Sequence, residues 1–101
     1  MNIASTYENG KLTLYLQGEL DHHSARPAMK AIERELEQSL ARECVLDMSG
    51  LTFMDSSGIA VILRARQKMQ LLDGSLLVRG VSPQARRVLE AAGINRLVTI
   101  K

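Results

Sequence analysis

Hydrophobic residues near the start of the chain recur at every second position, and further along they recur at every third or fourth. Between residues 11 and 17, leucine alternates with more polar residues, which is typical of a strand with one buried face. Asn9-Gly10 separates this segment from residues 3–7, and such a dipeptide is the strongest short signal for a tight hairpin turn. We therefore predict an antiparallel hairpin, followed by a polar connection over residues 18–23.

Three later segments have the helical period. The first begins at Ser24, a residue type that often caps helices. The second follows Asp55-Ser56-Ser57 and ends near Asp73-Gly74, and the third opens with Ser82-Pro83 and closes at Gly93. The residues expected to face the core are Ala25, Met29, Ile32, Leu36 and Leu40 in the first helix, and Gly58, Ile62, Ala65, Met69 and Leu72 in the second.

Short apolar runs between these helices predict further strands over residues 44–48, 75–79 and 97–100, with a loop over residues 49–54. The predicted order is β-β-α-β-α-β-α-β in a single domain, residues 1–101. Strands separated by helices pair in parallel through right-handed crossovers. The fold class is therefore α/β, with a mixed sheet, an N-terminal hairpin and helices packed against the sheet.

Composition narrows the classes of function. The chain has 101 residues, 46% of them hydrophobic, and a formal net charge of only +2. With no tryptophan and 3% aromatic residues, it lacks the stacking platforms and basic groove of a nucleic-acid binder. A single cysteine, Cys44, excludes an intrachain disulfide, and the start of the chain has neither a basic nor a long apolar segment. We expect a cytoplasmic protein that binds neither nucleic acid nor membrane.

The segment Asp55-Ser56-Ser57-Gly58 lies where a buried strand gives way to a helix. Sites in open α/β sheets gather beyond the carboxyl ends of the strands. A helix N-terminus offers free N–H groups and a partial positive charge, so it accepts a phosphoryl group well. Gly58, without a side chain, is expected to let another protein approach the backbone. The plainer alternative is that Asp55, Ser56 and Ser57 only cap the helix.

A wider pattern accompanies this segment. Residues 18–24 (Gly-Glu-Leu-Asp-His-His-Ser) and 51–59 (Leu-Thr-Phe-Met-Asp-Ser-Ser-Gly-Ile) closely resemble the anti-sigma-factor antagonists of spore-forming bacteria, which are STAS-domain proteins. Gly74 before a strand, Val81-Ser82-Pro83 before a helix and Ala92-Gly93-Ile94 before the last strand continue the resemblance. It spans nearly the whole chain in the right order.

The resemblance implies a switch. In that family the second serine of the motif, here Ser57, is phosphorylated by an ATP-dependent kinase that is also the anti-sigma factor. The unphosphorylated antagonist binds this kinase and frees the sigma factor, and a separate serine phosphatase restores it. The implied partner-binding residues are Asp21, Asp55, Ser56, Ser57 and Gly58, with Asp21 beside the serine. ATP is bound by the partner, so no cofactor, metal or catalytic residue is expected in this chain.

Other interpretations remain open at this point. Ser57 with His22 or His23 as base would make a serine hydrolase, but the glycine two positions before the nucleophile that such an elbow needs is missing. Two adjacent histidines alone make a poor metal site. A STAS interaction module of a stress-signalling or lipid-transport assembly would share the fold. Arg64 and Lys68, one turn apart, could meet an acidic partner or simply be solvated.

Overall fold

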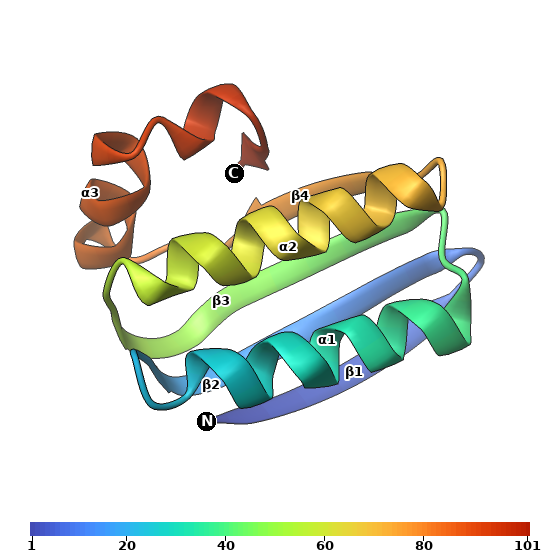
Figure 1. Ribbon diagram of the computed structural model, residues 1–101, viewed down its shortest axis with the longest axis horizontal. Coiled ribbons are helices and arrows are strands. Elements are labelled where there is room, and N and C mark those ends of the chain that lie inside the picture. Colours follow the sequence, from blue (N-terminus) through green and yellow to red (C-terminus); the bar gives the residue numbers. More distant parts are fainter.

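Five strands form one mixed sheet in the order β1-β2-β3-β4-β5 in the computed structural model, which describes residues 1–101 (Figure 1). The strands are β1 (Asn2–Glu8), β2 (Lys11–Leu20), β3 (Glu43–Met54), β4 (Ser75–Arg79) and β5 (Thr99–Ile100). The helices are α1 (Ala25–Ser39), α2 (Ser57–Leu71) and α3 (Pro83–Ala91), followed by a short 3₁₀ helix, η1 (Ile94–Arg96). The predicted α/β class and element order are confirmed.

The hairpin and the parallel pairings also agree with the prediction. β1 pairs with β2 in antiparallel fashion, whereas β2–β3, β3–β4 and β4–β5 are parallel. Asn9 and Gly10 both have positive φ angles, 52° and 81°. Positive φ at both central residues is what a two-residue type I′ turn requires, and few residues other than Asn and Gly adopt it readily.

Helices α1 and α2 lie side by side along the sheet and run in the same direction (Figure 1). The leucines of β2 pack into the core with Leu46 and Met48 of β3. Ala28, Ile32 and Leu36 are the buried residues of α1. The prediction that Leu40 belongs to this stripe is wrong, because Leu40 ends the helix in a left-handed conformation and its side chain is 66% exposed.

The third strand is longer than predicted. Residues 49–54, expected as a loop, continue β3, and their partners are residues 17–20 of β2. The register shifts twice along this pair, so the buried residues Met48, Leu51 and Met54 recur at every third position. Because β4 pairs with β3 only as far as Asp47, β2 and β3 extend together beyond the rest of the sheet.

The C-terminal region is rearranged slightly from the predicted strand over residues 97–100. The turn of η1 takes up residues 94–96, with Ile94 buried, and leaves β5 only two residues long. None of the helices is both long enough and apolar enough to cross a lipid bilayer.

Candidate functional site

The two strands that extend beyond the sheet bring the predicted site residues to one edge. Leu20 at the end of β2 and Met54 at the end of β3 are partners in the parallel register. Asp21 and Asp55 follow them directly, and the Asp55 N–H donates to the Leu20 carbonyl oxygen (3.2 Å). The segments that the sequence singled out, residues 18–24 and 51–59, are therefore neighbours in space.

The β3–α2 junction is organised by the Asp55 carboxylate. Its Oδ1 accepts a hydrogen bond from the Ser57 N–H at 2.8 Å, which satisfies one free donor of the first turn of α2. Ser56 stands immediately before the helix, but its side chain makes no capping hydrogen bond. Neither the Ser56 nor the Ser57 hydroxyl hydrogen-bonds to another protein atom. Asp55 thus does the capping, and both hydroxyls are left free.

Gly58 has a different surrounding from the one expected. A Cβ built on it would lie 2.5 Å from Met54 Cγ and 3.0 Å from Leu20 Cδ2. The space that a side chain would need is filled by the protein's own core, and Gly58 itself is buried. Its absence of a side chain lets α2 start close against the ends of β2 and β3, and so fixes the position of Ser57 beside them.

Helix α3 also holds the end of β3, through hydrogen bonds to Met54. The side-chain amide of Gln84 accepts from the Met54 N–H (3.0 Å) and donates to the Met54 carbonyl oxygen (2.7 Å). The Ser82 hydroxyl caps α3 by accepting from the Ala85 N–H, which confirms the predicted helix start. Gln84 replaces the hydrogen bonds that β4 does not reach far enough to make. Sequence reasoning missed this residue, and a lone glutamine on a short helix carries no signal for such a role.

At the β2–α1 junction the side chains of Asp21 and Ser24 are both hydrogen-bonded within the chain. Asp21 Oδ1 accepts from the N–H groups of His23 and Ser24, both at 3.0 Å. These bonds, above all the one from Ser24, hold the pKa of the Asp21 carboxyl below its usual value. The Ser24 hydroxyl donates to the Glu19 carbonyl oxygen (2.7 Å) and accepts from the Asp21 N–H. Ser24 does precede α1 as predicted, but the capping side chain is Asp21.

A surface groove of about 540 Å³ runs between α1 and α2 and is open to Ser57 at one end. Two ion pairs cross between these helices: Glu33–Arg64, with Oε2 and Nε 3.6 Å apart, and Glu37–Lys68, with Oε1 and Nζ 2.7 Å apart. Arg64 and Lys68 therefore have acidic partners within the chain. At the Ser57 end the groove is lined by His22, Arg26 and Lys30, side chains that take part in no ion pair.

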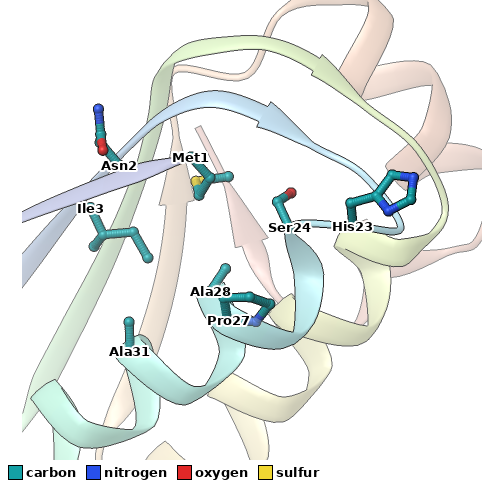
Figure 2. Close-up of a pocket in the computed structure, with 8 residues that line it drawn as sticks. All are labelled: Met1, Asn2, Ile3, His23, Ser24, Pro27, Ala28 and Ala31. Carbon is teal, nitrogen blue, oxygen red and sulfur yellow. The ribbon is translucent and has the colours of Figure 1, made fainter.

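A second hollow, of about 460 Å³, lies on the β1 side of α1. Figure 2 shows Met1 and Ile3 on one side of it and Pro27, Ala28 and Ala31 of α1 on the other. No residue of the β3–α2 junction lines it. This hollow is separate from the site around Ser57.

Phe53 adds an apolar element to the site that the sequence prediction did not include. It lies in β3, two residues before Asp55, and its side chain is 42% exposed. An exposed aromatic ring beside polar groups is typical of a contact surface for another protein. The exposure of Phe53 could not be predicted from the sequence, because residues 49–54 were expected to form a loop. Only a strand fixes which side chains point outward.

The side chains give little support to metal binding, to a serine–histidine catalytic pair or to a reactive thiol. No group of three or more His, Cys, Asp and Glu side chains is placed to hold a metal ion. His22 lines the same groove as Ser57, yet no hydrogen bond joins the two side chains. Burial raises the pKa of the Cys44 thiol to about 12, so the thiolate form needed for reactivity is scarce near neutral pH.

Comparison with known proteins agrees with the fold. The STAS domain model matches residues 2–101. An anti-sigma F factor antagonist of Paenibacillus polymyxa is 30% identical over 99% of this chain and 86% of its own length. The structure of the anti-sigma factor antagonist SpoIIAA in its unphosphorylated form matches with a TM-score of 0.83 and 23% identity, over 99% of this chain and 88% of that one. The phosphorylated form of the Bacillus cell fate determinant SpoIIAA matches with a TM-score of 0.73 and 23% identity, over 99% and 91%. This chain belongs to the STAS domain family.

Proposed function

We propose that this protein is an anti-sigma-factor antagonist whose switch is the phosphorylation of Ser57. The observation that carries the proposal is the free hydroxyl of Ser57 at the N-terminus of α2, on an edge where Asp21, Asp55 and Ser56 are also gathered. Its relatives of similar length are named as antagonists of anti-sigma factors. Because the chain resembles proteins of spore-forming bacteria, we expect it to act in the regulation of sporulation. The expected location of the protein is the cytoplasm.

In the proposed cycle, the unphosphorylated protein binds an anti-sigma factor that is also a serine kinase, and the sigma factor is released. The contact surface consists of Asp21, Asp55, Ser56 and Ser57, and Phe53 adds an apolar contact. Gly58 is buried behind this surface and lets α2 start close to the ends of β2 and β3. The kinase binds ATP and transfers the γ-phosphoryl group to the Ser57 hydroxyl oxygen. The phosphate ester bond forms as the bond between the γ-phosphorus and ADP breaks, ADP leaves, and the hydroxyl proton is lost. A serine phosphatase hydrolyses that ester and restores the antagonist.

Phosphorylation ends the complex through local charge and bulk. The added group carries a charge of about −1.5 to −2 at pH 7. In the complex it is buried against a surface shaped for a neutral hydroxyl, and an unpaired charge at an interface costs roughly 2 to 5 kcal/mol. At the helix N-terminus of the free protein the same group gains about 0.3 to 1 kcal/mol. The interface penalty is the larger effect, so no refolding of the antagonist is needed.

Two other functions agree less well with the arrangement of residues around Ser57. A serine hydrolase needs a base hydrogen-bonded to its nucleophile, and neither His22 nor His23 hydrogen-bonds to Ser57. A STAS module in a stress-signalling or lipid-transport assembly would not require the free serine at this edge, although it would share everything else. We therefore propose a binding protein that catalyses no reaction itself.

Reconstitution from purified components tests the proposal. The protein is added to a complex of a sigma factor with its anti-sigma kinase, taken from the genome that encodes this chain, and the released sigma factor is measured by size-exclusion chromatography. We expect release by the unphosphorylated protein, and loss of release after incubation with ATP. A Ser57→Ala variant should keep its releasing activity in the presence of ATP. Failure of the unphosphorylated protein to bind any such kinase would contradict the proposal.

A further inference from the structure

The Ser57 end of the α1–α2 groove differs from the rest of the groove, because its basic side chains have no acidic partner on the facing helix. Arg26 and Lys30 are both exposed on α1, and neither forms an ion pair or a side-chain hydrogen bond. Further along the groove the cations of α2 are matched by acids of α1, in the Glu33–Arg64 and Glu37–Lys68 pairs. The groove is thus neutralised at one end and positively charged at the end where Ser57 lies.

These ion pairs also fix how the two helices face each other. Seven residues correspond to about two helical turns, so residues seven apart lie on nearly the same face of a helix. Seven residues before Glu33 on α1 is Arg26, and seven residues before Arg64 on α2 is Ser57. Since α1 and α2 run in the same direction, Arg26 faces Ser57 in the same register in which Glu33 faces Arg64. Both Arg26 and Ser57 line the groove, as this register requires.

We propose that the groove end formed by Arg26, with Lys30 and His22 beside it, is an intramolecular binding site for the phosphoryl group of phosphorylated Ser57. The inference rests on the proposed phosphorylation of Ser57 and concerns what becomes of the group afterwards. A phosphoserine facing Arg26 completes the row of opposite charges between the helices, with the acid now on α2 and the base on α1. Guanidinium groups bind phosphate oxygens through paired N–H donors, so arginine suits this position better than lysine.

Other charges around the position modify the site without replacing Arg26. Asp55 at the junction and Asp21 beside it are negative, and they oppose the phosphate. The Asp21 and Asp55 Oδ1 atoms, however, already accept backbone N–H groups at their own helix starts. Glu33 is engaged by Arg64. The partial positive charge at the N-terminus of α2 attracts the phosphate along with His22, Arg26 and Lys30.

The second ionisation of the phosphoserine reports on this site. The test uses protein in which phosphoserine is built in at position 57 by genetic encoding, and ³¹P NMR follows the phosphate through a pH titration. A free phosphoserine titrates near pH 6. We expect a lower midpoint in the protein, and Arg26→Gln should raise it again by about 0.3 to 0.7 pH unit, the scale of one partly exposed charge pair. Lys30→Gln, one turn further away, should raise it less.

Arg34→Gln is the matched control, because it removes the same charge from an exposed position of α1 outside the groove. It should leave the midpoint unchanged, and 1 M salt should reduce the difference between the phosphorylated parent and Arg26→Gln. The proposal is overturned if Arg26→Gln and the parent titrate alike, whether at the value of free phosphoserine or at one lowered by the α2 N-terminus alone. Because the phosphoserine is installed without a kinase, this failure is distinct from a failure of Ser57 to be phosphorylated by the natural partner.

Discussion

The two strand-to-helix junctions at the edge of the sheet have nearly the same plan and opposite outcomes. In each, a buried strand ends at an apolar residue, an aspartate follows, and its carboxylate receives the N–H groups of the helix start. At the β2–α1 junction the serine that follows has its hydroxyl bonded to Glu19 and Asp21. At the β3–α2 junction neither serine hydroxyl is bonded to the protein.

This difference separates a serine that belongs to the fold from one that is available for chemistry. The Ser24 hydroxyl is needed to close its turn, so a modified Ser24 would disrupt the start of α1. The Ser57 hydroxyl can be modified without loss of any hydrogen bond within the chain. The aspartates differ too, since Asp21 accepts two N–H groups and Asp55 Oδ1 accepts one. Similar sequence motifs therefore acquire distinct roles from how many of their polar atoms are already engaged.

The largest expected effect is on partner binding at the open junction. Ser57→Asp places a charge where the complex expects a neutral hydroxyl, and should weaken binding of the anti-sigma kinase tens- to thousands-fold, on the order of the roughly 2 to 5 kcal/mol of a buried unpaired charge. Ser57→Ala should bind as tightly as the parent and resist inactivation by ATP. Calorimetric titration with the anti-sigma kinase, before and after incubation with ATP, measures the affinities of both variants. Equal affinity of Ser57→Asp and the parent would remove Ser57 from the interface.

A smaller effect compares the stability of the two junctions. Ser24→Ala loses the bonds to Glu19 and Asp21, and should lower the free energy of unfolding by about 1 to 2 kcal/mol. Ser57→Ala loses none, and should stay within about 0.5 kcal/mol of the parent. Thermal unfolding resolves this, since each kcal/mol shifts Tm by about 4 to 8 °C in a domain of this size. Equal Tm values for the two variants would show that the junctions do not differ as described.

The smallest expected effect is the pH dependence at Asp21. Its pKa is lowered in the folded protein, so the carboxylate contributes stability above its unfolded pKa, about 3.9. That contribution is lost as the pH falls through the folded value. Asp21→Asn keeps an acceptor for the cap and should hold Tm at neutral pH better than Asp21→Ala. If both variants melt like the parent, the cap is unimportant, and a loss of kinase binding in Asp21→Asn would then report the charge alone.

The sequence predicted the element order, and the place of Asp55-Ser56-Ser57 between a strand and a helix, because both depend on local patterns. Alternating leucines, the Asn-Gly turn and the Ser-Pro helix start are set within a few residues of each other. The extension of β3 escaped prediction because its buried residues, Met48, Leu51 and Met54, are three apart, a spacing produced by the register shifts against β2. No sequence period indicates a strand of that kind.

Residues whose roles depend on packing between distant segments could not be predicted. Gly58 is enclosed by Met54 and Leu20, and Gln84 binds the backbone of a strand 30 residues away. The register that sets Arg26 opposite Ser57 follows from ion pairs between two helices. By contrast, the grouping of Asp21 with Asp55 was implied by the resemblance alone, and the paired ends of β2 and β3 supply its physical reason.

Mapping the phosphoryl group after reaction with the anti-sigma kinase and ATP tests the central claim most directly. Intact-mass measurement followed by fragmentation of the peptides should find one phosphoryl group, located on Ser57, with Ser24 and Ser56 unmodified and Ser57→Ala protein unlabelled. Phosphorylation of Ser56, of Ser24, or of the Ser57→Ala variant would contradict the account.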